Sequence, residues 1–432
     1  MLMHIDGNSF YAACERVYRP DLAKSPIAVL SNNDGIIIAL NAECKALGFK
    51  RGDVFFENKN KLEKSGVVIF SSNYTLYADL SNRMNLIYNR FTPDVEMYSI
   101  DESFLFFPDW KNEDYSALAL TIKKAVTMET GIPVSVGVAP TKTLAKMCNK
   151  LAKKRGGVCD WNKLNQDEEL GNYPVGDIWG VGPSKAAFLK RNGITTALGL
   201  KNYPLHLAKK HLTITGYRTV RELGGVPAIG KVERSDRQVV MVSRSSQSPV
   251  YDLDDIILAL TSYTQEAVKR IRVEKLSCKF VSVYLMTNAF SEGDQYFNQC
   301  SAELPYLSAY LPEIQETAIE LLKRIYRPGY KYRKVMIGLT GLEKNDKPQY
   351  DLFDNHHEQV KRLEPLMQAL DNINERYGRG TLQLGCGVKR RKNEELGMRN
   401  EGAAGVALPW EMKREYLSPR YTTRLQDIPR VY

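Results

Sequence analysis

Two neighbouring carboxylates stand in the middle of an apolar segment, "YSIDESFLFF" at residues 98–107. If this segment is a buried strand, Asp101 and Glu102 repel each other and lose hydration, which would cost several kcal/mol. A third acid, Asp6, ends another short predicted strand, "LMHID". Divalent cations would remove the repulsion, and hard Mg²⁺ prefers carboxylate oxygens. Three acids at strand ends are the minimal set for two cations spaced for in-line phosphoryl transfer.

A regular strand would turn Asp101 and Glu102 to opposite faces, so a shared site requires a turn or a bulge at this point. The alternative is that both acids cap a solvent-exposed hairpin turn and take no part in chemistry. Spacing alone gives these two interpretations about equal weight.

A predicted basic helix follows the strand "PVSVGVA" and could contact phosphates. Its lysines recur at spacings of three and four, at Lys146, Lys150, Lys153 and Lys154. They form either a positive stripe that meets phosphates or a solvated helix face. The preceding "GVAPTKT" (137–143) lacks the second glycine before the lysine, so the Walker A signature fails. Simple NTPase activity by that route is therefore not expected.

Two further segments are candidates for the DNA backbone. "GVGPSK" places Gly180 and Gly182 before a helix that Pro183 can open, and its N-terminal N–H groups with Lys185 could bind a phosphate. The segment resembles a helix-hairpin-helix module, and a plain αα-hairpin is the alternative. "VKRIRVEKLSCKF" concentrates positive charge beside a predicted strand, at Lys269, Arg270, Arg272 and Lys275.

Composition limits the classes of protein. The 432 residues carry a net charge of +10, which favours a polyanionic partner. No apolar run is long enough to span a membrane, and the N-terminus lacks the features of a signal peptide. Seven scattered cysteines without a CxxC pair argue against a disulfide framework and a thiolate zinc site. We therefore expect a cytoplasmic protein with no membrane partner.

The pattern of elements predicts a multidomain protein with an α/β part and an α+β part. Residues 1–165 alternate strand and helix, residues 166–232 are helical, and residues 238–345 read as strand, helix, two strands, helix, strand. A polar segment then leads to a tail with one plausible helix, "QVKRLEPLMQALDNINERYG".

The ordered motifs resemble those of Y-family DNA polymerases, and most of all the UmuC-type catalytic subunit of bacterial DNA polymerase V. The motifs that carry the resemblance are "DGNSFYAACE", "SNNDGIIIALNAECKALG", "YSIDES", "GVAPTKTLAK" and "WGVGPSK", and the similarity continues to the closing "LSPRYTTRLQDIPRVY". The resemblance implies a right hand plus a little finger: palm 1–20 and 72–165, fingers 21–71, thumb 166–232, little finger 238–345 and C-terminal tail 346–432.

The resemblance also implies the roles of individual residues. Asp6, Asp101 and Glu102 would be the catalytic carboxylates for two Mg²⁺ ions, with the Gly7 carbonyl as a further ligand. Tyr11 would be the steric gate that excludes the ribose 2′-hydroxyl. The nucleotide pocket would also contain Phe10, Lys45 and Lys153.

The sequence departs from many relatives at Asn8, where they have a second aspartate, and at Ala42, where they have a tyrosine. The resemblance implies that the protein binds primer-template DNA and deoxynucleoside triphosphates. It also implies two protein partners in the SOS response, a UmuD′-type dimer and a RecA filament. "QYDLF" (349–353) resembles the peptide that binds the sliding clamp, through Gln349, Leu352 and Phe353.

The leading hypothesis is error-prone, template-directed synthesis past DNA lesions. A non-catalytic DNA-binding protein is one alternative, although buried acids without a use would only cost stability. A metal-dependent nuclease is the other, but Tyr11 and the lysines of the nucleotide pocket would then have no purpose.

Overall fold

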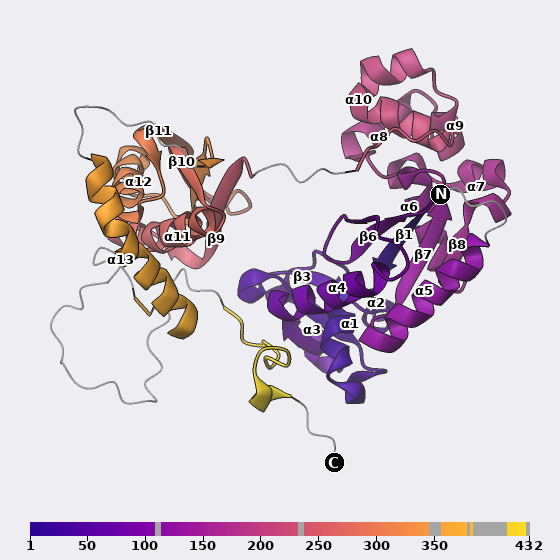
Figure 1. The fold of residues 1–432 in the computed structure, drawn as a ribbon, viewed down its shortest axis with the longest axis horizontal. Coiled ribbons are helices and arrows are strands. Elements are labelled where there is room, and N and C mark those ends of the chain that lie inside the picture. Colours follow the sequence, from indigo (N-terminus) through magenta and orange to yellow (C-terminus); the bar gives the residue numbers. More distant parts are fainter. Residues whose placement is uncertain (109–113, 232–236, 345–355, 378–380, 383–412, 429–432) are drawn as a thin grey trace. The chain divides into compact units, whose positions relative to one another are not determined.

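The computed structural model describes residues 1–108, 114–231, 237–344, 356–377, 381–382 and 413–428 (Figure 1). Contacts divide the chain into two units: Met1–Glu233 with Arg414–Tyr432, and Arg234–Lys413. Among the described residues, no helix combines the length and the apolar character that a membrane span requires.

A five-stranded sheet forms the centre of the first unit, in the order β5 (Val95–Met97), β6 (Glu102–Phe106), β1 (Leu2–Gly7), β7 (Val134–Ala139) and β8 (Val158–Asp160). β1 pairs antiparallel with both of its neighbours, whereas β7 and β8 run parallel. Because successive side chains of a strand point to opposite faces, Met3 and Ile5 share one face of β1 while His4 and Asp6 share the other.

Helices cover both faces of this sheet (Figure 1). Val136 of β7 packs in one core with α4 (Tyr74–Tyr88) and α5 (Tyr115–Thr130). Its neighbour Gly137 faces α6 (Lys142–Ala152) so closely that an added Cβ would lie 2.2 Å from the Ala145 carbonyl oxygen. α6 therefore lies on the face of the sheet that carries Asp6.

A three-stranded sheet, in the order β3 (Ile37–Leu40), β2 (Ile27–Leu30) and β4 (Val68–Ser71), forms a second part of this unit. Its helices are α1 (Phe10–Val17), α2 (Ala42–Ala46) and α3 (Phe55–Lys64), and α3 was not predicted from the sequence. A helical segment follows, with α7 (Gln166–Asn172), α8 (Pro183–Arg191), α9 (Ala197–Lys201) and α10 (Leu205–Leu223). α8 begins at Pro183 with Gly182 as its N-cap, as predicted.

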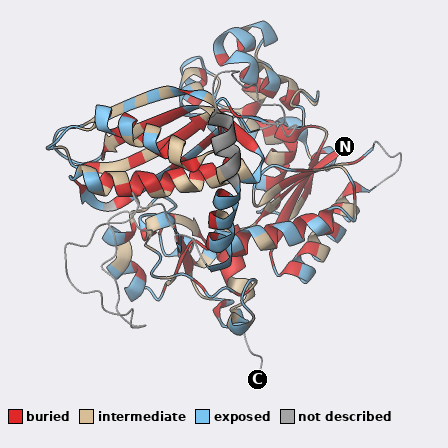
Figure 2. Cartoon of the chain, turned by 60° about the vertical axis from the view of Figure 1, so that its left-hand side comes forward, coloured by how far each residue is buried: buried red, intermediate tan, exposed pale blue. Residues whose placement is uncertain are grey.

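The second unit has the predicted succession of elements: β9 (Val239–Val250), α11 (Leu253–Val273), β10 (Leu276–Thr287), β11 (Phe297–Ser308), α12 (Leu311–Ile325) and β12 (Tyr332–Thr340). They form a sheet in the order β11-β10-β12-β9, and β13 (Glu343–Lys344) pairs with β10. α11 and α12 pack on one face, where Val281, Val283 and Leu285 are fully buried. Figure 2 shows buried positions along the strands and on the sides of the helices that pack on them.

The predicted single tail, 346–432, is divided between the two units. Helix α13 (His356–Tyr377) belongs to the second unit, where Asp371 accepts two hydrogen bonds from Arg272 of α11, at 2.8 and 2.9 Å. Residues 414–428 instead pack on the first unit. Sequence patterns could not predict this division, because it depends on contacts between residues far apart in the chain.

Candidate active site

The three acids meet at one end of the five-stranded sheet. Asp6 lies directly opposite Glu102 in the antiparallel pairing of β1 and β6, so their side chains share one face. The next residue, Gly7, donates its N–H to the Asp101 carbonyl at 2.9 Å. The pairing of two strands therefore brings together residues that are almost one hundred positions apart.

The segment 98–101 is a turn, which corrects the prediction of a continuous buried strand. β5 ends at Met97 and β6 begins at Glu102, and the N–H groups of Tyr98 and Ser99 both donate to the Glu102 carbonyl at 3.0 Å. The Ser99 hydroxyl donates to the Asp101 carboxylate at 2.7 Å. The turn leaves both acids partly exposed, so the full penalty of burying them does not arise.

Lysines of α6 neutralise two of these acids. Lys153 contacts Asp6 at 2.7 Å and Lys146 contacts Glu102 at 2.8 Å. Lys146 is also held over the ring of Tyr98, at 4.4 Å from its centroid. Lys150, on the same helix, instead pairs with Asp177 at 2.8 Å. The stripe predicted from the spacing therefore exists, and three of its lysines pair with acids.

The environment of Asp6 shifts its protonation. Desolvation by burial raises the pKa of Asp6 to about 6, although the neighbouring Lys153 lowers it. His4, on the same face of β1, is 2% exposed, and burial lowers its pKa well below the usual range. A carboxylate with a raised pKa is incompletely compensated, so the site has room for additional positive charge.

Within the described residues, no three acidic, histidine or cysteine side chains converge as a ready set of metal ligands. The chemistry of the donors nonetheless fits a hard cation, since Asp6 and Glu102 offer carboxylate oxygens on one face. Their present partners are lysine ammonium groups, and Lys153 is 43% exposed. A divalent ion and a triphosphate would compete with these ion pairs.

Tyr11 presents a partly exposed ring beside the acids. It stacks on Tyr77 of α4 at 4.5 Å between centroids and lies edge-on to Tyr74 at 5.9 Å. Phe10 is 3% exposed and packs beneath Gly7, where an added Cβ would approach its ring to 3.0 Å. Phe10 therefore supports the backbone under the site, and Tyr11 is the ring that remains accessible.

Other predicted pocket residues have separate environments. Lys45 is exposed in the last turn of α2, and Ala42, also exposed, begins that helix. Asn8 accepts a hydrogen bond from Ser135 at 2.9 Å, so its side chain ties β1 to β7. Burial raises the pKa of Tyr11, and the guanidinium of Arg51 lowers it, which places this exposed cation near the ring.

The glycine-containing segment before α8 has the predicted backbone geometry. Gly180 adopts a φ of 87°, in the region that favours glycine, and Gly182 caps α8 without a side-chain hydrogen bond. The Lys185 ammonium donates to the Thr215 hydroxyl. The first N–H groups of α8 therefore remain available for an anion.

The basic cluster on α11 is largely paired with acids. Arg270 pairs with Glu266, while Lys269 contacts Glu375 at 3.7 Å. Arg272 pairs with Asp371, as described above. Lys275 is exposed, with a positive φ of 56°. The predicted clamp-binding residues, Gln349, Leu352 and Phe353, lie outside the described residues.

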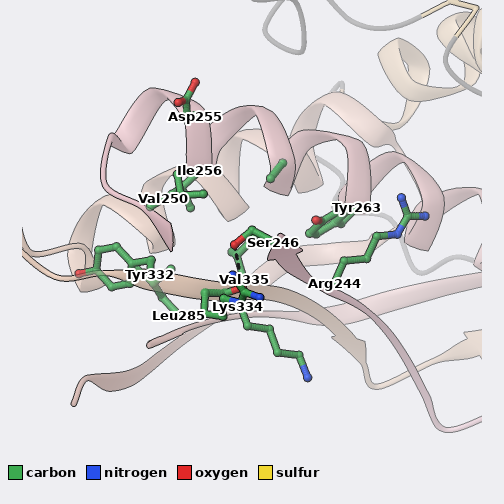
Figure 3. A pocket seen from close by; sticks show the side chains of 12 residues that line it. Arg244, Ser246, Val250, Asp255, Ile256, Tyr263, Leu285, Tyr332, Lys334 and Val335 are labelled. Atoms are coloured by element: carbon green, nitrogen blue, oxygen red, sulfur yellow. Dashed lines mark hydrogen bonds between the residues drawn. The ribbon is translucent and has the colours of Figure 1, made fainter. Parts of the chain in front are cut away.

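A pocket in the second unit lies between α11 and the sheet, lined by Arg244, Tyr263 and Tyr332 among others (Figure 3). Its cavity volume of ≈ 20 Å³ admits a water molecule but no nucleotide. This pocket is therefore not a candidate for the chemistry at the acids.

Sequence reasoning did not select Ser99 or Arg51 as site residues, and it named Lys146 only as part of the basic stripe. Lys146 of α6 and Lys153, the C-cap of that helix, are seven positions apart, two helical turns, so they share one face. This spacing was the signal that could have assigned both lysines to the site. Nothing local in the sequence identifies Ser99 or Arg51.

Comparison with known proteins defines the class. A sequence profile described as the impB/mucB/samB family matches residues 5–150, and the profile of its C-terminal domain matches residues 237–352. A domain of unknown function matches residues 364–431. The fold resembles that of a solved Y-family DNA polymerase chimera, Dbh-Dpo4-Dbh, with a TM-score of 0.64, 20% identity and coverage of 79% of this chain and 98% of that one.

Full-length relatives narrow the assignment. The chain is 38% identical over 434 residues to protein UmuC of Salmonella typhimurium, with 99% of each chain covered. It is also 28% identical over 408 residues to DNA polymerase IV of Bacillus velezensis, covering 92% of this chain and 95% of the relative.

The fold and the similarities define a Y-family DNA polymerase. The chain belongs to the impB/mucB/samB family, as a UmuC-type member. It is a DNA-directed DNA polymerase of translesion synthesis and SOS mutagenesis, and the alternatives of a nuclease or a non-catalytic DNA-binding protein are not favoured.

Proposed function

We propose that Asp6, Asp101 and Glu102 carry the nucleotidyl transfer of this polymerase. The observation that carries the proposal is the direct pairing of Asp6 with Glu102 on one face of the sheet, next to the turn that holds Asp101. Two Mg²⁺ ions, with the Gly7 carbonyl as a further ligand, would supply charge stabilisation for the primer 3′-hydroxyl and the leaving pyrophosphate.

Each residue of the site then has a defined task. The carboxylates hold the ions and orient the primer end. Lys153, whose ammonium is exposed, leaves Asp6 and binds the triphosphate with Lys45 and Arg51. Tyr11 closes the space beneath the incoming sugar, so that a 2′-hydroxyl meets the ring. Phe10 supports this wall from below.

The remaining parts of the chain bind DNA and partners. Residues 1–20 and 72–165 form the palm, 21–71 the fingers, 166–232 the thumb and 238–345 the little finger. The backbone N–H groups after Gly180 and Gly182, with Lys185, hold a phosphate of the primer-template duplex. The little finger adds positive charge at Lys269, Arg270, Arg272 and Lys275.

We further propose that a UmuD′-type dimer, a RecA filament and the sliding clamp assemble with this chain in the cytoplasm. Gln349, Leu352 and Phe353 form the clamp-binding peptide. A bound clamp would raise the effective concentration of the polymerase at the primer end. We expect low fidelity, as the family implies.

Primer extension past an abasic site tests the catalytic assignment. The reaction contains Mg²⁺, four deoxynucleotides, the clamp, a RecA filament and the cognate UmuD′-type partner. We expect extension by the wild-type chain and by the control variant Asp167→Ala, whose carboxylate is 72% exposed. Asp101→Ala should lose extension entirely. Equal extension by Asp101→Ala and the wild type would overturn the assignment of the acids.

A further inference from the structure

The C-terminal strap, residues 414–428, lies within the stretch matched as a domain of unknown function. It packs on the first unit, against segments more than three hundred positions earlier in the chain. We propose that the strap completes the sugar pocket, with Ser418 as a positioning residue for Tyr11. This inference rests on the proposed role of Tyr11 in sugar selection and adds the element that holds it in place.

The first contacts of the strap extend the three-stranded sheet. Ser71, the last residue of β4, donates its N–H to the Tyr416 carbonyl at 2.9 Å, and its hydroxyl accepts from the Tyr416 N–H at 3.0 Å. The Glu415 N–H donates to the buried Asp34 carboxylate at 2.9 Å. Tyr416 also lies edge-on to Phe55 of α3. The start of the strap is therefore fixed to the predicted fingers.

The middle of the strap contacts the predicted palm. Tyr421 is 7% exposed and stacks on Tyr18, just after α1, with 4.8 Å between centroids and an interplanar angle of 11°. The strap is thus anchored to the predicted fingers by hydrogen bonds and an aromatic contact, and to the predicted palm by ring stacking. The strap therefore spans the boundary between the predicted fingers and palm.

Ser418 lies between Tyr416 and Tyr421 of the strap and is 4% exposed. Its hydroxyl accepts a hydrogen bond from the Asn73 side-chain amide at 3.0 Å. The carbonyl oxygen of the same side chain accepts from the Leu76 N–H at 3.3 Å, which makes Asn73 the N-cap of α4. Ser418 therefore orients the residue that fixes the first turn of α4.

That first turn carries the two rings that contact Tyr11. Tyr77 stacks on it and Tyr74 meets it edge-on. The Tyr77 hydroxyl in turn donates to Glu15 at 2.6 Å. Glu15 lies one turn after Tyr11 on α1 and is fully buried. Tyr74 and Tyr77, the two rings that contact Tyr11, therefore lie in the turn whose N-cap, Asn73, is held by Ser418.

Additional support comes from Glu15 itself. Burial raises its pKa to about 7, and the hydrogen bond from Tyr77 and the nearby Ser418 lower it. The strap hydroxyl therefore acts directly on α4 through Asn73, and α4 is joined to α1 by the hydrogen bond from Tyr77 to Glu15. Loss of this hydroxyl should loosen the position of Tyr11 without removing any residue that contacts the nucleotide.

The test compares incorporation of dCTP and CTP opposite a template guanine, with the full chain and its partners. Ser418→Ala should reduce the ratio of the two kcat/KM values by about three- to tenfold, through a gain for CTP, because one buried hydrogen bond is lost. Ser418→Thr, which keeps the hydroxyl, should retain the wild-type ratio. Thr423→Ala, at an exposed position of the same strap, is the matched control.

Hydrogen exchange of the first turn of α4 gives a readout that does not depend on activity. We expect faster exchange of the Leu76 amide in Ser418→Ala than in Thr423→Ala. Unchanged exchange together with an unchanged sugar ratio in Ser418→Ala would overturn the positioning role.

Tyr11→Ala is the reference variant for the sugar measurement. It should abolish the discrimination between dCTP and CTP. If Tyr11→Ala keeps the wild-type ratio, the proposed gate is wrong. The exchange of Leu76 still decides whether the strap holds α4, so the two failures are distinguishable.

Discussion

At the scale of single residues, the proposed active site is a set of ion pairs that a substrate must rearrange. Asp6 and Glu102 are each paired with a lysine of α6, at 2.7 and 2.8 Å. Such pairs keep like charges apart in the absence of substrate. They also place two cations close to where a triphosphate would bind.

Replacing Lys153 with methionine should raise the pKa of Asp6 above its value of about 6, because the ion pair that opposes desolvation is lost. An NMR titration of the Asp6 carboxyl carbon in metal-free protein measures this change. Lys150→Met is the matched control, since Lys150 lies on the same helix but pairs with Asp177. An Asp6 pKa that is equal in both variants would contradict the importance of the Lys153 contact.

Glu15 should make stability depend on pH. Its pKa is raised from 4.5 to about 7 by burial, so the folded state binds the proton more tightly than the unfolded state. The free energy of unfolding should therefore fall as pH rises from about 4.5 to about 7, by about 3 kcal/mol from this group.

Urea unfolding of the wild type and Glu15→Gln at pH 5 and pH 8 measures this contribution. The variant should lose most of the difference between the two pH values. Glu57→Gln, at an exposed position of α3, should retain it. An unaltered pH dependence in Glu15→Gln would show that Glu15 does not take up the proton.

At the scale of elements, the position of α6 depends on the absence of a side chain at one strand position. A Cβ on Gly137 would lie 2.2 Å from the Ala145 carbonyl oxygen and 2.3 Å from the Asn149 nitrogen. Both are backbone atoms of α6, so they cannot move independently of the helix. Asn149 adds hydrogen bonds to the carbonyls of His4 and Ser135, at 3.0 and 2.7 Å.

Gly137→Ala should therefore displace α6 together with Lys146 and Lys153. We expect destabilisation by about 1–3 kcal/mol and a loss of primer extension. Thermal unfolding and the extension assay measure the two effects. Gly35→Ala is the control, because its added Cβ would meet the Ser31 hydroxyl at an ordinary 3.8 Å. Wild-type behaviour of Gly137→Ala would mean that the close packing is not required.

At the scale of the whole molecule, a buried ion pair ties the first unit together. Lys142 at the start of α6 contacts Glu96 of β5 at 2.6 Å and donates to the Gly230 carbonyl at 2.8 Å. Both side chains are less than 10% exposed, at 3% and 7%. The pair connects the five-stranded sheet, helix α6 and the segment that follows α10.

Lys142→Met should destabilise the first unit by about 3–5 kcal/mol, because Glu96 would remain buried and unpaired. Calorimetry of the full chain measures the loss. The double variant Lys142→Met with Glu96→Leu should recover much of it, since no uncompensated charge remains. If the single and double variants unfold alike, the unpaired charge is not the cause.

The sequence by itself determined the class and most of the elements. Period-two and helical patterns predicted the succession in residues 238–345, and Pro183 marked the start of α8. The acids were identified because carboxylates in an apolar segment require compensation. These inferences depend on local physics, namely alternation, capping and desolvation, which a short stretch of residues contains.

The tertiary structure decided which distant residues compensate one another. The pairing of Asp6 with Glu102 follows from strand register, and the pairing of both with α6 follows from the close approach at Gly137. The commitment of Arg272 to Asp371, and the docking of Ser418 beside Asn73, join segments separated by long stretches of chain. Such contacts are chosen by global packing, and local propensity contains no information about them.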